Sequence, residues 1–447
     1  MTDSAVTEAP SRRATGGRNF WTLRKENLDF MIGLMIVVPI FFQVTGDIGL
    51  YSGAVFASGL VLPLSYFVLP LMLMSLLRGS KVLLNFGESY LFFMVGFFVW
   101  VVLLGLSSAL SHQVALLYAV QWILPFFASF YGAALVSRER RFRKFFHGFL
   151  IGTVVSVCVL VSVAGIEALF LGGLAGGRMS SNAVIPGFYQ LYNYVPIGMA
   201  VAVLFCVGVL AYRRGIRFKM LGLAIWSACL VFLMVVASRG ALLVFVAITL
   251  YFLYVMRKTP AAIFSFVGII ALGTVVVVAT DFRPTELSAF EKFSEIIYGE
   301  ERVRLASRDS IVSRALFIYQ ENALLGTAMV PPGTVLPKWG EFSSAHNYYI
   351  DVLLWAGPIG LILVLGLVLI ISKDALRFLM IRPRSVTGNG LVWLCHVTAP
   401  LILSVFLISN NLRVPMRQPY SGILIFLFIG IFLGALQGLR KGRVVSL

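Results

Sequence analysis

Residues 347–372 read "NYYIDVLLWAGPIGLILVLGLVLIIS", and this stretch indicates the class of the protein. A helix needs about 20 mostly apolar residues to cross a lipid bilayer, and this run is long enough. The rest of the chain has the same character, because 59% of its 447 residues are hydrophobic and only 12% are charged. Soluble domains carry about 25% charged residues. The sequence therefore predicts an all-α, polytopic membrane protein.

Apolar runs of this kind recur along the chain, so we predict about twelve transmembrane helices. They span residues 28–45, 53–77, 88–110, 113–136, 146–171, 191–212, 219–237, 240–256, 260–280, 347–372, 390–409 and 419–438. The first nine fill a domain at 28–280, and the last three fill a domain at 347–438. The remaining segments are a polar tail at 1–27, a large loop at 281–346 and a short tail at 439–447.

The lysines and arginines predict how the chain is oriented. Cytoplasmic segments of membrane proteins are enriched in both residues. Basic residues cluster in the first tail and then in every second connection, at 78–81, 137–144, 213–219, 257–258, 372–384 and 440–443. We therefore expect both termini in the cytoplasm and the large loop on the outer side. The net charge of +17 mostly follows from this topology, so we expect a lipid bilayer and no nucleic acid as partner.

The large loop at 281–346 is expected to contain helical pieces. In "SRDSIVSRALFIYQ", at residues 307–320, apolar side chains recur with helical spacing. They are Ile311, Val312, Ala315, Leu316 and Tyr319. Such a stripe is typical of an amphipathic helix, which could lie on the membrane or cover a cavity.

Several familiar motifs are absent from the sequence. There is no GxxxxGK[ST] or GxGxxG, so nothing indicates nucleotide binding. No cluster of His, Asp and Glu offers ligands to a divalent metal ion, and no GxSxG nucleophile elbow occurs. We therefore expect neither a cofactor nor a metal.

Cationic side chains on the predicted outer side remain to be explained. Arg239 lies in the short turn "ASRGALL", Arg308 lies in the large loop, and Arg413 and Arg417 lie in "NNLRVPMRQP". An arginine fork binds oxyanions through two hydrogen bonds and keeps its charge, so these residues could bind phosphate groups. Each also has a structural alternative. Arg239 could be an interfacial anchor, Arg308 a surface helix residue paired with an acid, and the last two could cap the outer ends of helices.

His346 is the one histidine of this outer polar region, directly before the apolar run at 347–372. An unperturbed imidazole exchanges protons near neutral pH. The other three histidines, His112, His147 and His396, are more simply explained as packing residues. A base beside several arginines would form a plausible site for a reaction at a phosphate ester.

Three segments resemble motifs of the bacterial O-antigen ligase and O-antigen polymerase superfamily, in the order of that family. "ASRGALLVFVAI" is similar to its SRG-type turn. "SRDSIVSRALFIYQENALLG" resembles its segment with an arginine and a later glycine, here Arg308 and Gly326. "AHNYYIDVLLWAGPIG" resembles its His-Asn motif followed by G-x-x-G, here Gly357 and Gly360. The resemblance covers about residues 220–370, with Trp355 where many relatives carry an acid and Val312 where a tryptophan is usual.

The resemblance implies a metal-independent glycosyltransferase of a bacterial inner membrane, with its active site at the periplasmic face. The donor would be a glycan on polyprenyl (undecaprenyl) pyrophosphate, and the acceptor a sugar hydroxyl on lipid A-core or on a growing polysaccharide. His346 would accept or orient the hydroxyl proton. Arg239 and Arg308 would bind the pyrophosphate and stabilise its leaving charge. Arg413, Arg417 and Asn347 are further candidates for substrate binding.

The resemblance leaves the acceptor open. A ligase in lipopolysaccharide assembly is the leading interpretation. A polymerase of O-antigen, capsule or exopolysaccharide repeat units would use the same residues. A polysaccharide flippase or another transporter is a third possibility, although it would need polar residues through the membrane midplane, and the mid-membrane helices contain almost no charge. A non-catalytic glycan-binding membrane protein is the fourth.

Overall fold

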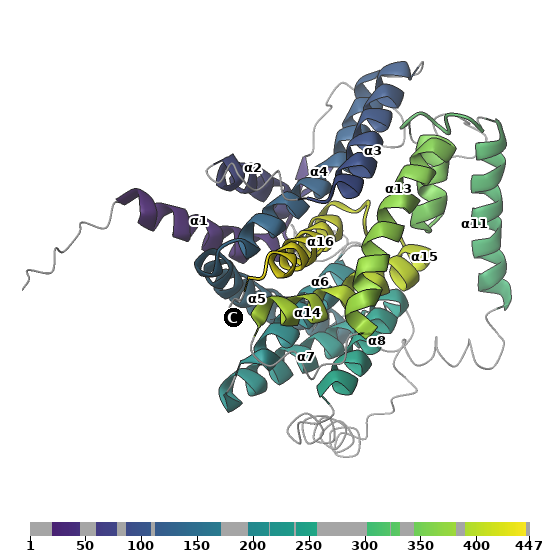
Figure 1. Cartoon of the computed structure of the whole chain (residues 1–447). Coiled ribbons are helices and arrows are strands. Elements are labelled where there is room, and N and C mark those ends of the chain that lie inside the picture. The colour runs from purple at the N-terminus through teal and green to yellow at the C-terminus, as the bar shows by residue number, and fades with distance from the viewer. Residues whose placement is uncertain are drawn as a thin grey trace, which may run out of the picture.

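The computed structural model describes residues 20–44, 60–77, 86–108, 112–170, 195–213, 215–236, 238–256, 302–321, 323–330, 344–380 and 389–443. This part of the chain is almost entirely helical (Figure 1). The helices of the N-terminal half are α1 (Phe20–Ile36), α2 (Leu64–Leu77), α3 (Glu88–Ser107), α4 (His112–Val136), α5 (Glu139–Phe170) and α6 (Val195–Tyr212). They are followed by α7 (Ile216–Val235), α8 (Arg239–Met256), α11 (Arg302–Glu321), α13 (Tyr348–Met380), α14 (Gly390–Ser404), α15 (Asn410–Leu412) and α16 (Pro419–Arg440). The π-helix η6 (Val405–Ser409) joins α14 to α15.

The described helices confirm the membrane class. Eight of them are long and apolar enough to cross a membrane, and shorter apolar helices lie at Asn27–Ile36, Leu64–Leu77 and Gly240–Val255. The predicted helix at 260–280 lies outside the described residues, as does most of the large loop at 281–346. The count of twelve therefore stays a prediction, whereas the all-α class is confirmed.

Two predicted helix boundaries near the N-terminus were wrong. Residues Phe41–Val44 and Leu60–Pro63 form two short antiparallel strands, β1 and β2, where helices at 28–45 and 53–77 were expected. Pro39 explains the first error, because proline disfavours a helical conformation in the residue before it. α1 accordingly ends at Ile36, and α2 begins only after Pro63.

Helix α16 runs through the middle of the bundle and is buried along nearly all of its length (Figure 1). It packs against α4 so closely that a Cβ atom at Gly430 would collide with the backbone of Ser129. A Cβ at Gly132 would collide likewise with the backbone of Leu427. Small residues allow such close contact, from which membrane helices gain van der Waals packing. The segment that precedes α16, residues 413–418, is thereby held on a rigid element.

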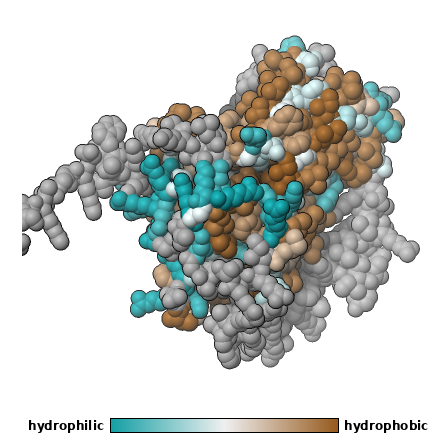
Figure 2. All heavy atoms as spheres, in the orientation of Figure 1, coloured by the Kyte–Doolittle hydropathy of each residue, from teal (hydrophilic) through white to brown (hydrophobic). Residues whose placement is uncertain are grey.

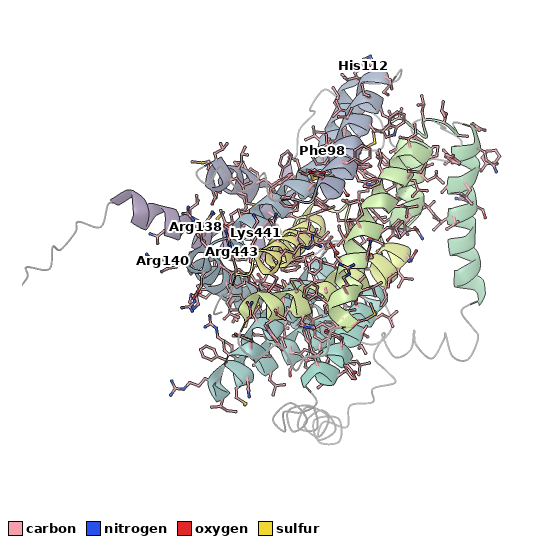
Figure 3. All side chains as sticks on the ribbon, viewed as in Figure 1. Phe98, His112, Arg138, Arg140, Lys441 and Arg443 are labelled. Carbon is pink, nitrogen blue, oxygen red and sulfur yellow. The ribbon has the colours of Figure 1, made fainter. Side chains whose placement is uncertain are left out.

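The predicted cytoplasmic segments meet at one end of this bundle. Arg440 forms an ion pair with Asp374 at 3.5 Å, and Asn389 donates to the carbonyl oxygen of Arg443 at 3.1 Å. Figure 3 shows Arg138 and Arg140 on the same side of the molecule as Lys441 and Arg443, and Figure 2 shows hydrophilic residues gathered there. Among the described residues, the structure thus groups the basic segments at 137–144 and 440–443 as the charge pattern predicts. That this end faces the cytoplasm stays a prediction.

Candidate functional site

Helix α13 is broken close to its beginning, and the break shapes the candidate site. Gly357 has φ 67° and ψ −172°, and Pro358 follows it. Proline has no N–H group and cannot bond to the carbonyl one turn earlier, so the carbonyl of Leu354 needs another donor. It accepts from the backbone N–H of Thr327 at 2.8 Å. The next two carbonyls accept from Met329 N at 3.0 Å and from Trp100 Nε1 at 2.7 Å.

The turn that supplies two of these donors follows α11, at residues 323–330. Gly326 and Gly357 both have positive φ, and a Cβ on either one would press against a backbone carbonyl of the other segment. Ala328 and Met329 have φ of 50° and 64°, a left-handed backbone that residues other than glycine rarely adopt. The bonds to α13 hold these residues in place. Gly326, the glycine of the Arg308 motif, and Gly357, the first glycine of G-x-x-G, therefore lie side by side.

Arg308 lies in the first half of α11, which packs along α13 (Figure 1). Its side chain is outside the described residues. Further along the helix, Ala315 and Ile318 are buried, whereas Leu316 is 40% exposed. The helix predicted in the large loop is confirmed, but its buried face is shifted from the expected stripe.

His346 lies directly before α13 with an exposed side chain, and its φ of 55° is left-handed. Its backbone N–H donates to the hydroxyl of Ser344 at 3.0 Å. Asn347 caps the helix, because its Oδ1 accepts from the backbone N–H groups of Tyr349 at 3.0 Å and Ile350 at 3.2 Å. The amide of Asn347 also donates to the carbonyl of Asn411 at 3.5 Å. The binding role predicted for Asn347 stays a prediction, and the structure adds the role of helix cap.

The predicted outer segments meet around α15. Asn411 contacts Asn347, and Arg413 follows α15 directly, with its N–H bonded to the carbonyl of Ser409 at 2.8 Å. Gly240 lies beside the same short helix, since a Cβ there would be 3.7 Å from Leu412 Cβ. Arg239 is the first residue of α8, and its side chain is outside the described residues. The segments that carry His346, Arg413 and Arg239 are therefore neighbours.

The π-helix η6 positions α15 beside the first turn of α13. Tyr349 donates from its hydroxyl to the carbonyl of Phe406 at 2.8 Å, and the amide of Asn410 lies 3.5 Å from the same hydroxyl. A π-helix adds a residue to a helical turn and frequently marks a functional site. Here it continues the helix predicted at 390–409: the regular α-helix ends at Ser404, and the helical segment extends to Leu412.

Arg417 contacts an acid that the sequence alone did not single out. Its Nη1 is 2.8 Å from Oδ2 of Asp351, which is fully buried in the first turn of α13. The same carboxylate accepts from the backbone N–H of Ala345 at 2.7 Å and from the hydroxyl of Ser344 at 2.8 Å. One signal could have identified Asp351: it is the one charged residue between Tyr348 and Ser372.

Trp355 packs against the guanidinium of Arg417. The guanidinium of Arg417 lies 4.2 Å from the centre of its ring and 5.6 Å from that of Trp122. Arginine is attracted to the faces of aromatic rings, most strongly to tryptophan. Arg417 thus has partners for its charge within the protein, and its predicted binding of substrate is untested.

The arrangement combines an exposed imidazole with neighbouring arginine-bearing segments. The N-termini of α8 and α13 both adjoin α15, and the N-terminus of a helix favours bound anions. Among the described residues, no group of three His, Cys, Asp or Glu side chains could hold a metal ion. The described part of the site thus places the exposed imidazole of His346 near the segment that carries Arg413, and a reaction at a phosphate ester stays a prediction.

Comparison with known families gives one match. The family described as O-antigen ligase matches residues 223–365, a range that includes Arg239, Arg308, Gly326, His346 and Gly357. No curated protein matches the chain. The family match confirms the resemblance inferred from the three motifs: residues 223–365, about a third of the chain, are similar to the O-antigen ligase family.

Proposed function

We propose that the protein transfers a glycan from polyprenyl (undecaprenyl) pyrophosphate to a sugar hydroxyl at the periplasmic face of a bacterial inner membrane. The observation that carries this proposal is the meeting of three segments that are far apart in the sequence. The turn at Arg239, the His346–Asn347 motif and the segment of Arg413 all contact or adjoin α15. The O-antigen ligase match over residues 223–365 supports the reaction class.

In this reaction the acceptor oxygen bonds to the anomeric carbon of the glycan. The bond between that carbon and the pyrophosphate oxygen breaks, and the pyrophosphate leaves on the polyprenyl chain with the bonding electrons. His346 accepts the hydroxyl proton, which makes the oxygen a better nucleophile. Arg239 and Arg308 stabilise the charge that develops on the leaving pyrophosphate, with Arg413 as a further cation.

An O-antigen ligase, which attaches the glycan to lipid A-core, is the first candidate, and a repeat-unit polymerase is the second. Both would bind the donor with the same groups, and they differ in the acceptor. Purified protein in nanodiscs, given a lipid-linked oligosaccharide donor with and without lipid A-core, therefore distinguishes them. A ligase forms product only when lipid A-core is added. A polymerase forms a ladder of longer lipid-linked chains from the donor alone.

We expect transfer to lipid A-core, and equal rates in excess EDTA because cationic side chains take the role of a metal. A rate that EDTA abolishes and magnesium restores would contradict the arginine mechanism. Absence of both products, with donor moved across the bilayer of a proteoliposome, would replace the proposal with a flippase.

A further inference from the structure

Asp351 joins three parts of the candidate site through one buried carboxylate. Oδ1 accepts from the N–H of Ala345 at 2.7 Å. Oδ2 accepts from the hydroxyl of Ser344 and from Nη1 of Arg417, both at 2.8 Å. The acid itself belongs to α13, and Arg417 belongs to the segment before α16. The carboxylate thus connects two helices with the irregular segment that ends at His346.

The connection extends to the backbone of His346. The hydroxyl of Ser344 has one hydrogen, which it donates to Asp351, so its oxygen is left to accept the N–H of His346 at 3.0 Å. His346 has a left-handed backbone, with φ of 55°, which non-glycine residues adopt only when their surroundings hold them there. The bonds to Asp351 are the described interactions that fix the two residues before His346.

We propose that Asp351 is a positioning residue for His346, and that Arg417 serves this arrangement by compensating the buried negative charge. The proposal rests on the function proposed above, in which His346 acts on the acceptor hydroxyl. A buried carboxylate is stable only when it is paired and hydrogen-bonded. Arg417 is itself only 14% exposed and lies against Trp355. The pair therefore holds the histidine segment against α13.

A test must remove both charges together, because a single substitution would leave the other charge buried and unpaired. In the double variant Asp351→Ala/Arg417→Met, the N–H of Ala345 loses its acceptor. The hydroxyl of Ser344, which accepts from the N–H of His346, loses its own bond to Asp351. We expect the Ala345 amide to exchange its hydrogen with solvent about tenfold faster or more. We also expect kcat for glycan transfer to fall about ten- to a hundredfold, since a small misplacement of a catalytic group has effects of that size. The KM for the lipid-linked donor should change less than about twofold.

A neutral pair provides the rescue. In Asp351→Asn/Arg417→Gln, the amide oxygen of Asn can still accept from the N–H of Ala345, and its NH2 group can donate one hydrogen to Gln and the other to the hydroxyl oxygen of Ser344, which keeps a lone pair for the N–H of His346. We expect this variant to protect the Ala345 amide and to retain kcat within about threefold of wild type. A slow neutral variant with a protected Ala345 amide would show that the charges matter for another reason, and would overturn the proposal.

The chain also offers a matched control. Asp29 and Arg141 form a second buried pair at 2.7 Å, with exposures of 2% and 16%. The double variant Asp29→Ala/Arg141→Met should leave kcat and the Ala345 amide unchanged. Equal losses of kcat in both double variants would reduce Asp351 to a general packing role and overturn the proposal.

The two proposals can fail separately. Amide exchange requires no substrate, so it measures the anchoring of the segment even if the wild-type protein transfers no glycan. If the wild type transfers glycan but the Asp351→Ala/Arg417→Met variant keeps both its Ala345 protection and its kcat, the positioning role is wrong and the proposed function stands.

Discussion

Two buried pairs of aspartate and arginine occupy different regions of the molecule and have different hydrogen-bond partners. Asp29 receives donors from side chains alone: Ser75 at 3.1 Å, Tyr131 at 3.0 Å and two nitrogens of Arg141 at 2.7 and 2.9 Å. These residues lie on α1, α2, α4 and α5, so the pair joins four helices.

Asp351 receives one arginine nitrogen, one hydroxyl and one backbone N–H. Trp122, which borders this pair, and Tyr131, which belongs to the other, are separated by about 13 Å along α4. The donors other than arginine therefore determine which parts of the chain each buried ion pair holds together. The Asp29 pair fixes helices to one another, whereas the Asp351 pair fixes an irregular segment that carries a candidate base.

Replacement of His346 tests the chemical half of this comparison and should have the largest effect. Asparagine tolerates the left-handed backbone better than alanine does, so His346→Asn removes the imidazole while the fold is kept. We expect glycan transfer to slow about 10²- to 10⁴-fold, the usual effect of losing a general base. The rate of donor consumption by purified protein in nanodiscs measures it.

His147→Asn is the matched control, because His147 is exposed on α5, the helix that carries Arg141 of the other pair, and is not the packing residue expected from the sequence. This variant should transfer glycan at the wild-type rate. If His346→Asn did the same, His346 would not be the base, and the region of Asp351 would be structural like that of Asp29.

Conservative replacement of the arginines should have the next largest effect and separates phosphate binding from interfacial anchoring. Lysine keeps the charge of Arg239 or Arg308 but cannot form the paired hydrogen bonds of a planar guanidinium. Each charge-assisted hydrogen bond contributes about 1.5–3 kcal/mol, so Arg239→Lys and Arg308→Lys should each slow transfer roughly ten- to a hundredfold. Single-turnover rates with the lipid-linked donor are the measurement.

Arg138→Lys, at the basic end of the bundle, is the control and should change nothing (Figure 3). Full activity in both Arg239→Lys and Arg308→Lys would leave the two residues as interfacial anchors, which need only a charge on a flexible stem.

The smallest expected effect concerns stability and compares the two pairs directly. Arg141 binds Asp29 through two nitrogens, whereas the described bond from Arg417 to Asp351 uses Nη1. Lysine can replace one such bond but not two. Arg141→Lys should therefore cost about 1.5–3 kcal/mol of stability, and Arg417→Lys less than about 1 kcal/mol. Thermal unfolding of each variant in the same detergent measures the difference. A larger loss in Arg417→Lys would contradict the role assigned to the number of arginine bonds.

The sequence predicted the features that repeat along the chain. Apolar runs predict most of the described helices, and the basic connections predict which segments gather at one end, as Arg440 and Asn389 show. Helix ends were less predictable. The early end of α1 depends on Pro39, and the π-helix depends on contacts such as that of Tyr349 with the Phe406 carbonyl. Both features leave the hydropathy of the apolar run unchanged, so hydropathy alone predicts neither of them.

At the site, residue types identified the cations and the histidine but not their partners. Arg413 and Arg417 look alike in "NNLRVPMRQP", yet Arg417 is bound by Asp351 and stacked on Trp355. That pairing joins residues 66 positions apart and depends on how α13 and α16 are arranged. The bond between Ser344 and Asp351 spans only seven residues, but it requires a turn that no residue pattern announced.

The docked turn at 323–330 and the anchored residues 344–346 are both fixed to α13 by hydrogen bonds. The described residues on either side of 331–343 are therefore both attached to α13 between Asp351 and Trp355. Insertions and deletions in such a stretch leave the flanking geometry intact, because the cost of closing a loop grows only slowly with its length. We therefore expect changes of chain length between the two attachments to leave the backbone of His346 where Asp351 holds it.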